Sequence, residues 1–315
     1  MKEGHLPVLV EEVISMLAPA PGSLQIDATV GGGGHTERIL EASDPDGRLL
    51  GLDADGAAIA RVDERLRPRF GDRLVLRRAN FRELRDVAPD AGFGGVDGML
   101  FDLGLSSFQL GDAERGFGFR TGGPLDMRFD TSRGVPAAEL LATLDRMELS
   151  ALFKRYGEEP QANRIANAIV AARATAPVAT AEELAALIER VAPANPRVRR
   201  RIHPATRVFQ ALRIAVNAEL DALQDALSAA IDLLRPGGRL VVLSYHSLED
   251  RIVKRFLASE RRGCVCPPEV PVCVCGKNPR LRLITRPSLT PTAEEIAANP
   301  RARSARLRAA ERLAA

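Results

Sequence analysis

Apolar and polar positions follow two alternating rhythms over the first third of the chain. Four short apolar runs predict buried strands, at residues 24–30, 49–52, 74–76 and 96–103. Three intervening segments carry apolar side chains at helical intervals, at residues 36–42, 57–66 and 81–87. Strands that alternate with helices predict an α/β fold in which a parallel sheet is covered on both faces.

This rhythm stops after Gly104, where the chain becomes Gly-rich and irregular. Helical periodicity then returns in four segments, at residues 138–144, 149–155, 162–172 and 181–191. Thr180 and Glu183 are spaced to form a capping box at the start of the last segment. A helical insertion of about a hundred residues, typical of a small domain, therefore interrupts the α/β pattern after its fourth strand.

The α/β pattern resumes in the last third of the chain. An amphipathic run over residues 209–234 ends at residues 235–238, Arg-Pro-Gly-Gly, where proline and glycine stop a helix. A strand, a helix and two strand-like segments follow, at residues 240–243, 248–257, 281–285 and 305–309. We expect residues 1–107 and 208–315 to form the sheet domain and residues 108–207 to form the insertion.

Charge and hydropathy limit the class of protein. The 44 basic and 41 acidic side chains give a formal net charge of +3, which is too small for the whole chain to act as a polycation. Any nucleic-acid site must therefore be local. No apolar run approaches the roughly 20 residues that span a bilayer, and the first residues lack the apolar core of a signal peptide. We expect a cytoplasmic protein.

Chemistry-bearing residues follow the predicted strands at their carboxyl ends. A glycine loop, Gly31 to Gly34, comes after the first strand, and Asp53 ends the second. Phe81 follows the third strand and Asp102 ends the fourth. Open α/β sheets bind ligands at this edge, where glycines let a ligand approach the backbone and an acid accepts hydrogen bonds from ribose hydroxyls. A purely structural turn and a solvated loop acid are the alternative interpretations.

The ligand is better matched by a nucleoside than by a dinucleotide. Thr36 stands where the dinucleotide fingerprint requires a third glycine. S-adenosylmethionine has no diphosphate to clamp, and the two final strand segments suit the closing hairpin of a methyltransferase sheet. Two alternatives from other classes remain. Binding of a nicotinamide cofactor would indicate a dehydrogenase, and binding of S-adenosylmethionine without turnover would indicate an RNA-binding module that lacks catalysis.

Motifs spread over almost the whole chain resemble the ribosomal RNA small-subunit methyltransferase H family. They include Gly-Gly-Gly-Gly-His-Thr, Gly-Pro-Leu-Asp-Met-Arg, His-Pro-Ala-Thr-Arg-Val-Phe-Gln-Ala-Leu-Arg and Ser-Tyr-His-Ser-Leu-Glu-Asp-Arg, which begin at residues 31, 123, 203 and 244. The resemblance implies a class I, Rossmann-like methyltransferase sheet and S-adenosylmethionine as the methyl donor. It implies cofactor contacts at Gly33, Gly34, His35, Asp53, Phe81, Asp102 and Gln109. Gly32 stands where relatives often carry a bulkier residue.

The resemblance also implies the substrate, which is the exocyclic 4-amino group of a cytosine in 16S, small-subunit ribosomal RNA. The partner is then ribosomal RNA or the small ribosomal subunit, and the helical insertion helps to hold the RNA. The residues alone do not specify this acceptor: the Pro-Pro-aromatic motif of many amino-methylating DNA enzymes is absent, as is a Pro-Cys nucleophile at a strand end. DNA, transfer RNA or protein therefore remain alternative substrates.

Two residues are candidates for the transfer step itself. Asp126 could accept a hydrogen bond from the target amine, and the His246 imidazole could accept its proton. The alternatives are a loop cap for Asp126 and a structural histidine for His246.

Two further clusters stand outside the cofactor site. Five arginines lie close together at the end of the insertion, Arg197, Arg199, Arg200, Arg201 and Arg207. They could bind RNA phosphates, or they could form a solvated basic loop. All four cysteines lie in two Cys-Val-Cys pairs, Cys264, Cys266, Cys273 and Cys275. Structural zinc sites usually separate paired cysteines by two or more residues, so the sequence favours an unmetallated surface loop and we assign no metal ligand.

Overall fold

The computed structural model describes residues 7–119, 122–193, 203–267 and 269–314. Their contacts divide the chain into two compact units. The sheet unit comprises Met1–Gly104 and Leu220–Ala315, and the helical unit comprises Leu105–Glu219. In the described part of the chain, no helix is both long and apolar enough to cross a membrane.

The sheet unit is built on seven strands in the order β3-β2-β1-β4-β5-β7-β6. Their bounds are β1 (Leu24–Asp27), β2 (Arg48–Asp53), β3 (Leu74–Arg78), β4 (Val96–Asp102), β5 (Leu234–Ser244), β6 (Leu281–Leu283) and β7 (Arg306–Arg312). Strands β1 to β5 pair in parallel, and β7 runs antiparallel to both β5 and β6. The predicted α/β fold, with its parallel sheet and closing antiparallel hairpin, is confirmed.

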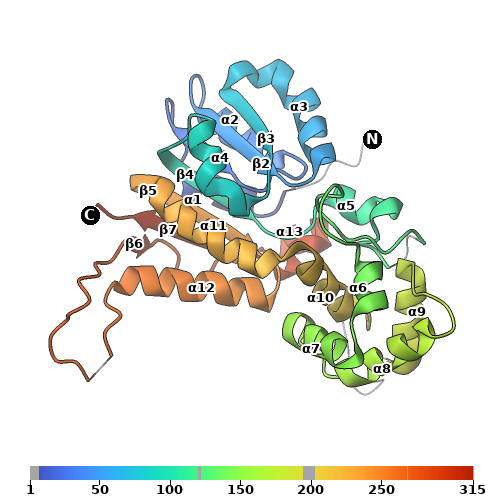
Figure 1. The fold of residues 1–315 in the computed structure, drawn as a ribbon. Coiled ribbons are helices and arrows are strands. Elements are labelled where there is room, and N and C mark those ends of the chain that lie inside the picture. Colours follow the sequence, from blue (N-terminus) through green and yellow to red (C-terminus); the bar gives the residue numbers. More distant parts are fainter. Residues whose placement is uncertain (1–6, 120–121, 194–202, 268, 315) are drawn as a thin grey trace. The chain divides into compact units, whose positions relative to one another are not determined.

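Helices cover both faces of this sheet (Figure 1). One face packs against α1 (Val10–Leu17), α2 (Gly34–Ala42) and α3 (Gly56–Phe70). The other packs against α4 (Leu84–Asp90), α11 (Glu219–Leu233) and α12 (Ser247–Arg262). The strands are therefore buried on both sides, which explains why they read as short, nearly continuous apolar runs.

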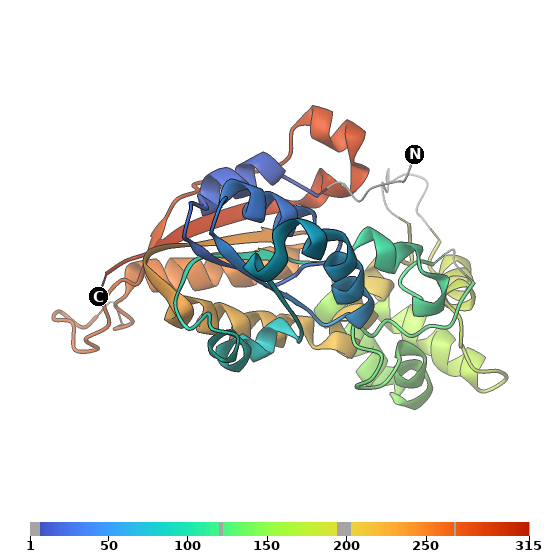
Figure 2. The same cartoon turned by 90° about the horizontal axis from the view of Figure 1, so that it is seen from above.

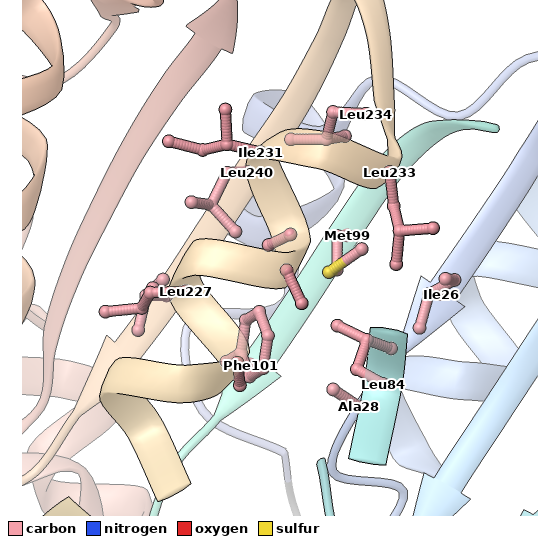
Figure 3. Close-up of a cluster of buried hydrophobic side chains, with 14 of the residues drawn as sticks. Ile26, Ala28, Leu84, Met99, Phe101, Leu227, Ile231, Leu233, Leu234 and Leu240 are labelled. Carbon is pink, nitrogen blue, oxygen red and sulfur yellow. The ribbon is translucent and has the colours of Figure 1, made fainter. Parts of the chain in front are cut away.

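The periodicity of α11 shows how the sequence positions a helix on the sheet. Leu223, Leu227 and Ile231 recur every four residues and are all buried, so they form a single stripe. In Figure 3, Leu227 and Ile231 lie beside Phe101 of β4 and Leu240 of β5 within one hydrophobic cluster. This packing holds β4 and β5 side by side, and their carboxyl ends carry candidate site residues.

The helical unit has its own hydrophobic core. Its helices are α5 (Ser107–Gly111), α6 (Ala137–Thr143), α7 (Arg146–Gly157), α8 (Ala162–Arg173), α9 (Ala181–Val191) and α10 (Thr206–Asn217). Short helical segments complete the described chain: η1 (Gly71–Arg73), η2 (Phe81–Glu83), η3 (Ala113–Arg115), α13 (Ala293–Ala298) and η4 (Pro300–Ser304). The predicted capping box of α9 is confirmed, since Thr180 and Glu183 each bind the other's backbone N–H.

The structure differs from the predicted pattern between residues 206 and 239. The amphipathic run is two helices, because Ala218 adopts a left-handed conformation with φ 48° between α10 and α11. Helix α10 buries Val208 and Leu212 in the core of the helical unit, so the unit boundary falls at Glu219 instead of residue 207. Helix α11 ends at Leu233, directly before the predicted stop at residues 235–238. Those residues already belong to β5, which pairs at Leu234, shifts register and pairs regularly from Arg239.

Candidate active site

The carboxyl ends of the parallel strands bring three aspartates to one edge of the sheet. Asp27, Asp53 and Asp102 are the last residues of β1, β2 and β4. After β1 the chain passes through the glycine loop into α2, and after β5 it passes through Tyr245 into α12. This edge of an open parallel sheet is where such folds bind their ligands.

The glycine loop is sterically required by the fold. Gly33 is the N-cap of α2 with φ +75°, and a Cβ there would lie 2.8 Å from a methyl of Val62. A Cβ on Gly34 would lie 2.8 Å from the ring of Pro7. The backbone of the loop is therefore fixed tightly against its neighbours. Both the structural and the binding interpretations of these glycines are compatible with this geometry.

Asp53 is held by backbone N–H groups on both of its oxygens. Gly31 N–H donates to Oδ2 and Asp55 N–H donates to Oδ1, each over 2.8 Å. Burial raises the pKa of Asp53 to about 6, against the lowering effect of these two bonds. A carboxylate has about four lone-pair sites, so each Asp53 oxygen keeps an acceptor site beyond its backbone bond. This is the acceptor geometry that two neighbouring hydroxyls require.

Asp102 is the centre of a side-chain network at the end of β4. Its Oδ1 accepts a 2.7 Å hydrogen bond from the Tyr245 hydroxyl, and its Oδ2 lies 3.4 Å from His35 Nδ1. The other ring nitrogen of His35, Nε2, lies 3.0 Å from the Val8 carbonyl oxygen. Burial disfavours the charged imidazole, yet Asp102 and the other nearby acceptors raise the pKa of His35 above 6.5. A protonated His35 would therefore have a hydrogen-bond acceptor at each ring nitrogen, Asp102 at Nδ1 and the Val8 carbonyl at Nε2.

Asp27 and Tyr245 also lie at this edge of the sheet, although neither is predicted as a site residue from the sequence. Asp27 is buried, and its oxygens accept from the Thr36 hydroxyl over 2.7 Å and from Thr29 N–H over 3.1 Å. Burial raises the pKa of Asp27. The signal for Asp27 was present, because it directly precedes the glycine loop at a strand end. Tyr245 lies in the family motif that begins at Ser244, but no local pattern reveals its partner Asp102, which is 143 positions away.

Phe81 lies where the sequence predicts, directly after β3. Its ring packs edge-on against Phe101, with centroids 6.0 Å apart and planes at 83°. Asn80 caps this turn by accepting from Arg82 N–H over 3.0 Å. The Phe81 ring is thereby fixed at the rim of the sheet while remaining only partly buried.

Two predicted site residues, Gln109 and Asp126, belong to the helical unit. Gln109 is buried, and its Oε1 accepts from Ser106 N–H in the capping box of α5. Asp126 forms a bidentate ion pair with Arg128 over 2.9 and 2.7 Å, and accepts from Arg128 N–H as well. Desolvation works against ionisation, but Arg128 lowers the pKa of Asp126 below its usual value. Asp126 is thus a fixed, ionised carboxylate.

His246 is the N-cap of α12. Its Nδ1 accepts from Glu249 N–H over a long 3.4 Å, and its Nε2 lies 3.1 Å from Glu249 Oε1. The second carboxylate oxygen of Glu249 accepts from Tyr245 N–H and His246 N–H. Nε2 of the imidazole therefore faces the Glu249 carboxylate, and Nδ1 faces the Glu249 N–H, to which it is weakly bonded.

The predicted arginine cluster is only partly described. Arg197, Arg199, Arg200 and Arg201 lie outside the described residues. Arg207 lies in the first turn of α10, and its Nη1 donates to the Glu158 carbonyl oxygen over 3.2 Å.

The strand order, the antiparallel β7 and the polar strand ends together define a class I, S-adenosylmethionine-dependent methyltransferase. The chain belongs to the MraW methylase family, whose model matches residues 2–313.

Three relatives illustrate how far the similarity extends. Ribosomal RNA small subunit methyltransferase H of Thermomicrobium roseum is 57% identical over 310 residues, which cover 98% of this chain and 94% of the relative. The proteins of the same name from Syntrophotalea carbinolica and Symbiobacterium thermophilum are 51% and 49% identical. The alignments cover 98% of this chain and 98% of the Syntrophotalea protein, and 99% and 97% for the Symbiobacterium protein.

Proposed function

We propose that this protein transfers a methyl group from S-adenosylmethionine to the exocyclic 4-amino group of a cytosine in 16S ribosomal RNA. The assignment of the substrate depends on the 57% identity to a small-subunit ribosomal RNA methyltransferase over 98% of the chain. The geometry of the strand ends supports the cofactor. The small ribosomal subunit or its RNA is therefore the proposed partner.

The residues at the sheet edge fit S-adenosylmethionine chemically. The cofactor offers two ribose hydroxyls, an adenine ring, an ammonium group and a cationic sulfonium. Asp53 has acceptor sites for both hydroxyls, and Phe81 presents a fixed ring for one face of the adenine. The Asp102 carboxylate at the carboxyl end of β4 favours a cationic ligand.

The glycine loop and His35 complete the proposed binding surface. Gly33 and Gly34 add no side chain of their own between the loop backbone and a ligand. His35 braces Asp102 from the first turn of α2. We propose that Gln109 of the helical unit adds a further contact to the cofactor, as the family resemblance implies. When bound, the cofactor supplies an electrophilic methyl group.

The protein's own task is to make a poor nucleophile react. The lone pair of a cytosine amine is delocalised into the ring, so the amine must be held in place and its hydrogens drawn away from the ring plane. We propose Asp126 as the acceptor for one amine N–H. Its ionised state, secured by Arg128, suits that role.

We further propose His246 Nδ1 as the acceptor of the amine proton. Accepting it costs only the long cap bond to Glu249 N–H, and the resulting imidazolium would face the Glu249 carboxylate through Nε2. The helical unit is proposed to help hold the RNA.

Mass spectrometry of ribosomal RNA nucleosides from cells with and without this protein tests the proposed function. We expect 4-N-methylated cytidine to disappear from 16S RNA in its absence and to return with the wild-type gene. In vitro, purified small subunits, free 16S RNA, transfer RNA, DNA and protein substrates are compared as methyl acceptors. Transfer confined to DNA, transfer RNA or protein would refute the ribosomal assignment while leaving the methyltransferase class intact.

A further inference from the structure

The four cysteines occupy a loop that projects from the sheet unit between α12 and β6, drawn in orange in Figures 1 and 2. They are all the cysteines of the chain. Each pair has the form Cys-Val-Cys, and in an extended segment alternate side chains point to the same side. Cys264 and Cys266 can therefore face Cys273 and Cys275 across the loop, with the intervening valines turned outward.

The sulfur positions match this expectation. All four Sγ atoms lie within 4.8 Å of one another. Cys273 Sγ lies 3.4 Å from that of Cys264, 3.9 Å from that of Cys266 and 3.5 Å from that of Cys275. The Sγ atoms of Cys264 and Cys275 are 3.9 Å apart. In tetrahedral zinc tetrathiolates the Zn–S distance is about 2.3 Å, so neighbouring sulfurs are about 3.8 Å apart.

Backbone N–H groups also point at two of these sulfurs. Val265 N–H donates to Cys275 Sγ over 3.5 Å, and Val274 N–H donates to Cys266 Sγ over 3.4 Å. Each bond crosses from one Cys-Val-Cys pair to the other. These two bonds help to hold the pairs of cysteines face to face.

Apolar burial does not hold this loop in its shape. Val265, Val272 and Val274 are 61%, 71% and 81% exposed. The base of the loop is tied to the sheet unit, where Glu260 pairs with Lys277 over 3.2 Å and with Arg280 over 2.7 Å. Between these anchors, the convergence of four thiols is the feature that a bound ion would stabilise.

We propose that Cys264, Cys266, Cys273 and Cys275 bind one Zn²⁺ ion in a structural tetrathiolate site. The Cys-Val-Cys spacing argues against zinc by sequence alone, but the loop brings the two pairs face to face and removes that objection. Four protein ligands complete a tetrahedral shell, so no position remains for substrate or water. The ion therefore braces the loop and takes no part in methyl transfer.

The test uses the full-length protein, purified under reducing conditions without chelators. Elemental analysis should find about one zinc per chain in the wild type and in Val274→Ser, which changes the exposed residue between two ligands. The double variant Cys264→Ser/Cys275→Ser should bind less than about a tenth as much. Because the chain has no other cysteine, the number of thiols that react with a thiol reagent reports on this site alone. The reagent should label four thiols only after the zinc is displaced.

A second measurement follows the loop itself. Trypsin should cut at Arg262 and Lys277, which flank the cluster, much faster in the double variant or after chelation than in the zinc-bound wild type and Val274→Ser. Three results would overturn the proposal: reduced protein that takes up no zinc from equimolar solution, zinc retained in the double variant, or thiols recovered as disulfides. Metal content is measured without a methylation assay, so this outcome is independent of the proposed function.

Discussion

The hydroxyl of Tyr245 donates a 2.7 Å hydrogen bond to Oδ1 of Asp102. This bond joins the end of β4 to the residue that follows β5. Because His35 Nδ1 lies 3.4 Å from the other oxygen, Asp102 is oriented from two sides. A carboxylate held in this way presents its remaining lone pairs in fixed directions.

Removal of the tyrosine hydroxyl should weaken that arrangement. Hydrogen bonds to charged groups contribute about 1.5–3 kcal/mol, so Tyr245→Phe should lower cofactor affinity or the single-turnover rate by roughly 10 to 150-fold. Calorimetry and single-turnover methylation measure the two quantities. Tyr156→Phe changes the only other tyrosine of the chain and serves as the control. Wild-type values for both quantities in Tyr245→Phe would show that Asp102 needs no such support.

Asp53 should dominate the affinity for the cofactor. Asp53→Ala removes the acceptor for one or two hydroxyls, and each charge-assisted bond is worth about 1.5–3 kcal/mol. Isothermal titration calorimetry with S-adenosylmethionine should therefore show a loss of at least about tenfold. Asp46→Ala, at an exposed loop acid, is the control. An affinity in Asp53→Ala equal to that of the control would remove Asp53 from the site.

The affinity for the cofactor should depend on pH through the same residue. The pKa of Asp53 is raised from 3.8 to about 6. Below that value the carboxyl is neutral and a poorer acceptor, so affinity should fall by about tenfold per pH unit at most. His35 also titrates above 6.5, and Asp53→Asn separates the two because it abolishes only the Asp53 contribution. An unchanged pH profile in Asp53→Asn would assign the dependence to another group.

The same shift has a defined effect on stability. A carboxyl whose pKa is higher in the folded state binds its proton more tightly there, so Asp53 destabilises the fold at neutral pH. The contribution of Asp53 to the free energy of unfolding should therefore become more favourable as the pH falls from above 6 towards 3.8. In thermal unfolding without cofactor, the Tm difference between Asp53→Asn and the wild type should therefore change over this interval. A constant difference would contradict the raised pKa.

His246 has a capping role that must be separated from its proposed role as proton acceptor. Asparagine is also a good N-cap, whereas alanine costs about 0.5–2 kcal/mol at such a position. His246→Asn should keep the free energy of unfolding and the cofactor affinity of the wild type. Its single-turnover rate should nevertheless fall by about 100 to 10,000-fold, as for the loss of a general base. Near-normal methylation by His246→Asn would leave only the capping role.

Asp126 can be tested against its own ion-pair partner. Asp126→Asn removes the proposed acceptor charge, and Arg128→Ala breaks the same bidentate pair while keeping the carboxylate. We expect the rate of methyl transfer to fall by about 100-fold or more in Asp126→Asn, with unchanged cofactor affinity. Arg128→Ala should have the smaller effect. Equal losses in the two variants would show that only the ion pair matters.

The sequence determined those features that depend on neighbouring residues. Each parallel strand was visible because burial on both faces requires a short apolar run, and each strand end was visible because a polar or glycine residue follows that run. This is why Asp53 and Asp102 could be assigned before the fold was known. The capping box of Thr180 and Glu183 was equally local, since its two partners are one helical turn apart.

Only the tertiary structure decided the relationships between distant segments. The hydrogen bond from Tyr245 to Asp102 exists because β5 pairs with β4, and nothing near Tyr245 in the sequence encodes that pairing. The break at Ala218 was hidden because α10 and α11 are both amphipathic, and only their burial in two different cores separates them. The sulfur cluster depended on how the loop folds back on itself. Residue spacing measures distance along the chain, whereas the folding of that loop sets the distances between the four sulfur atoms.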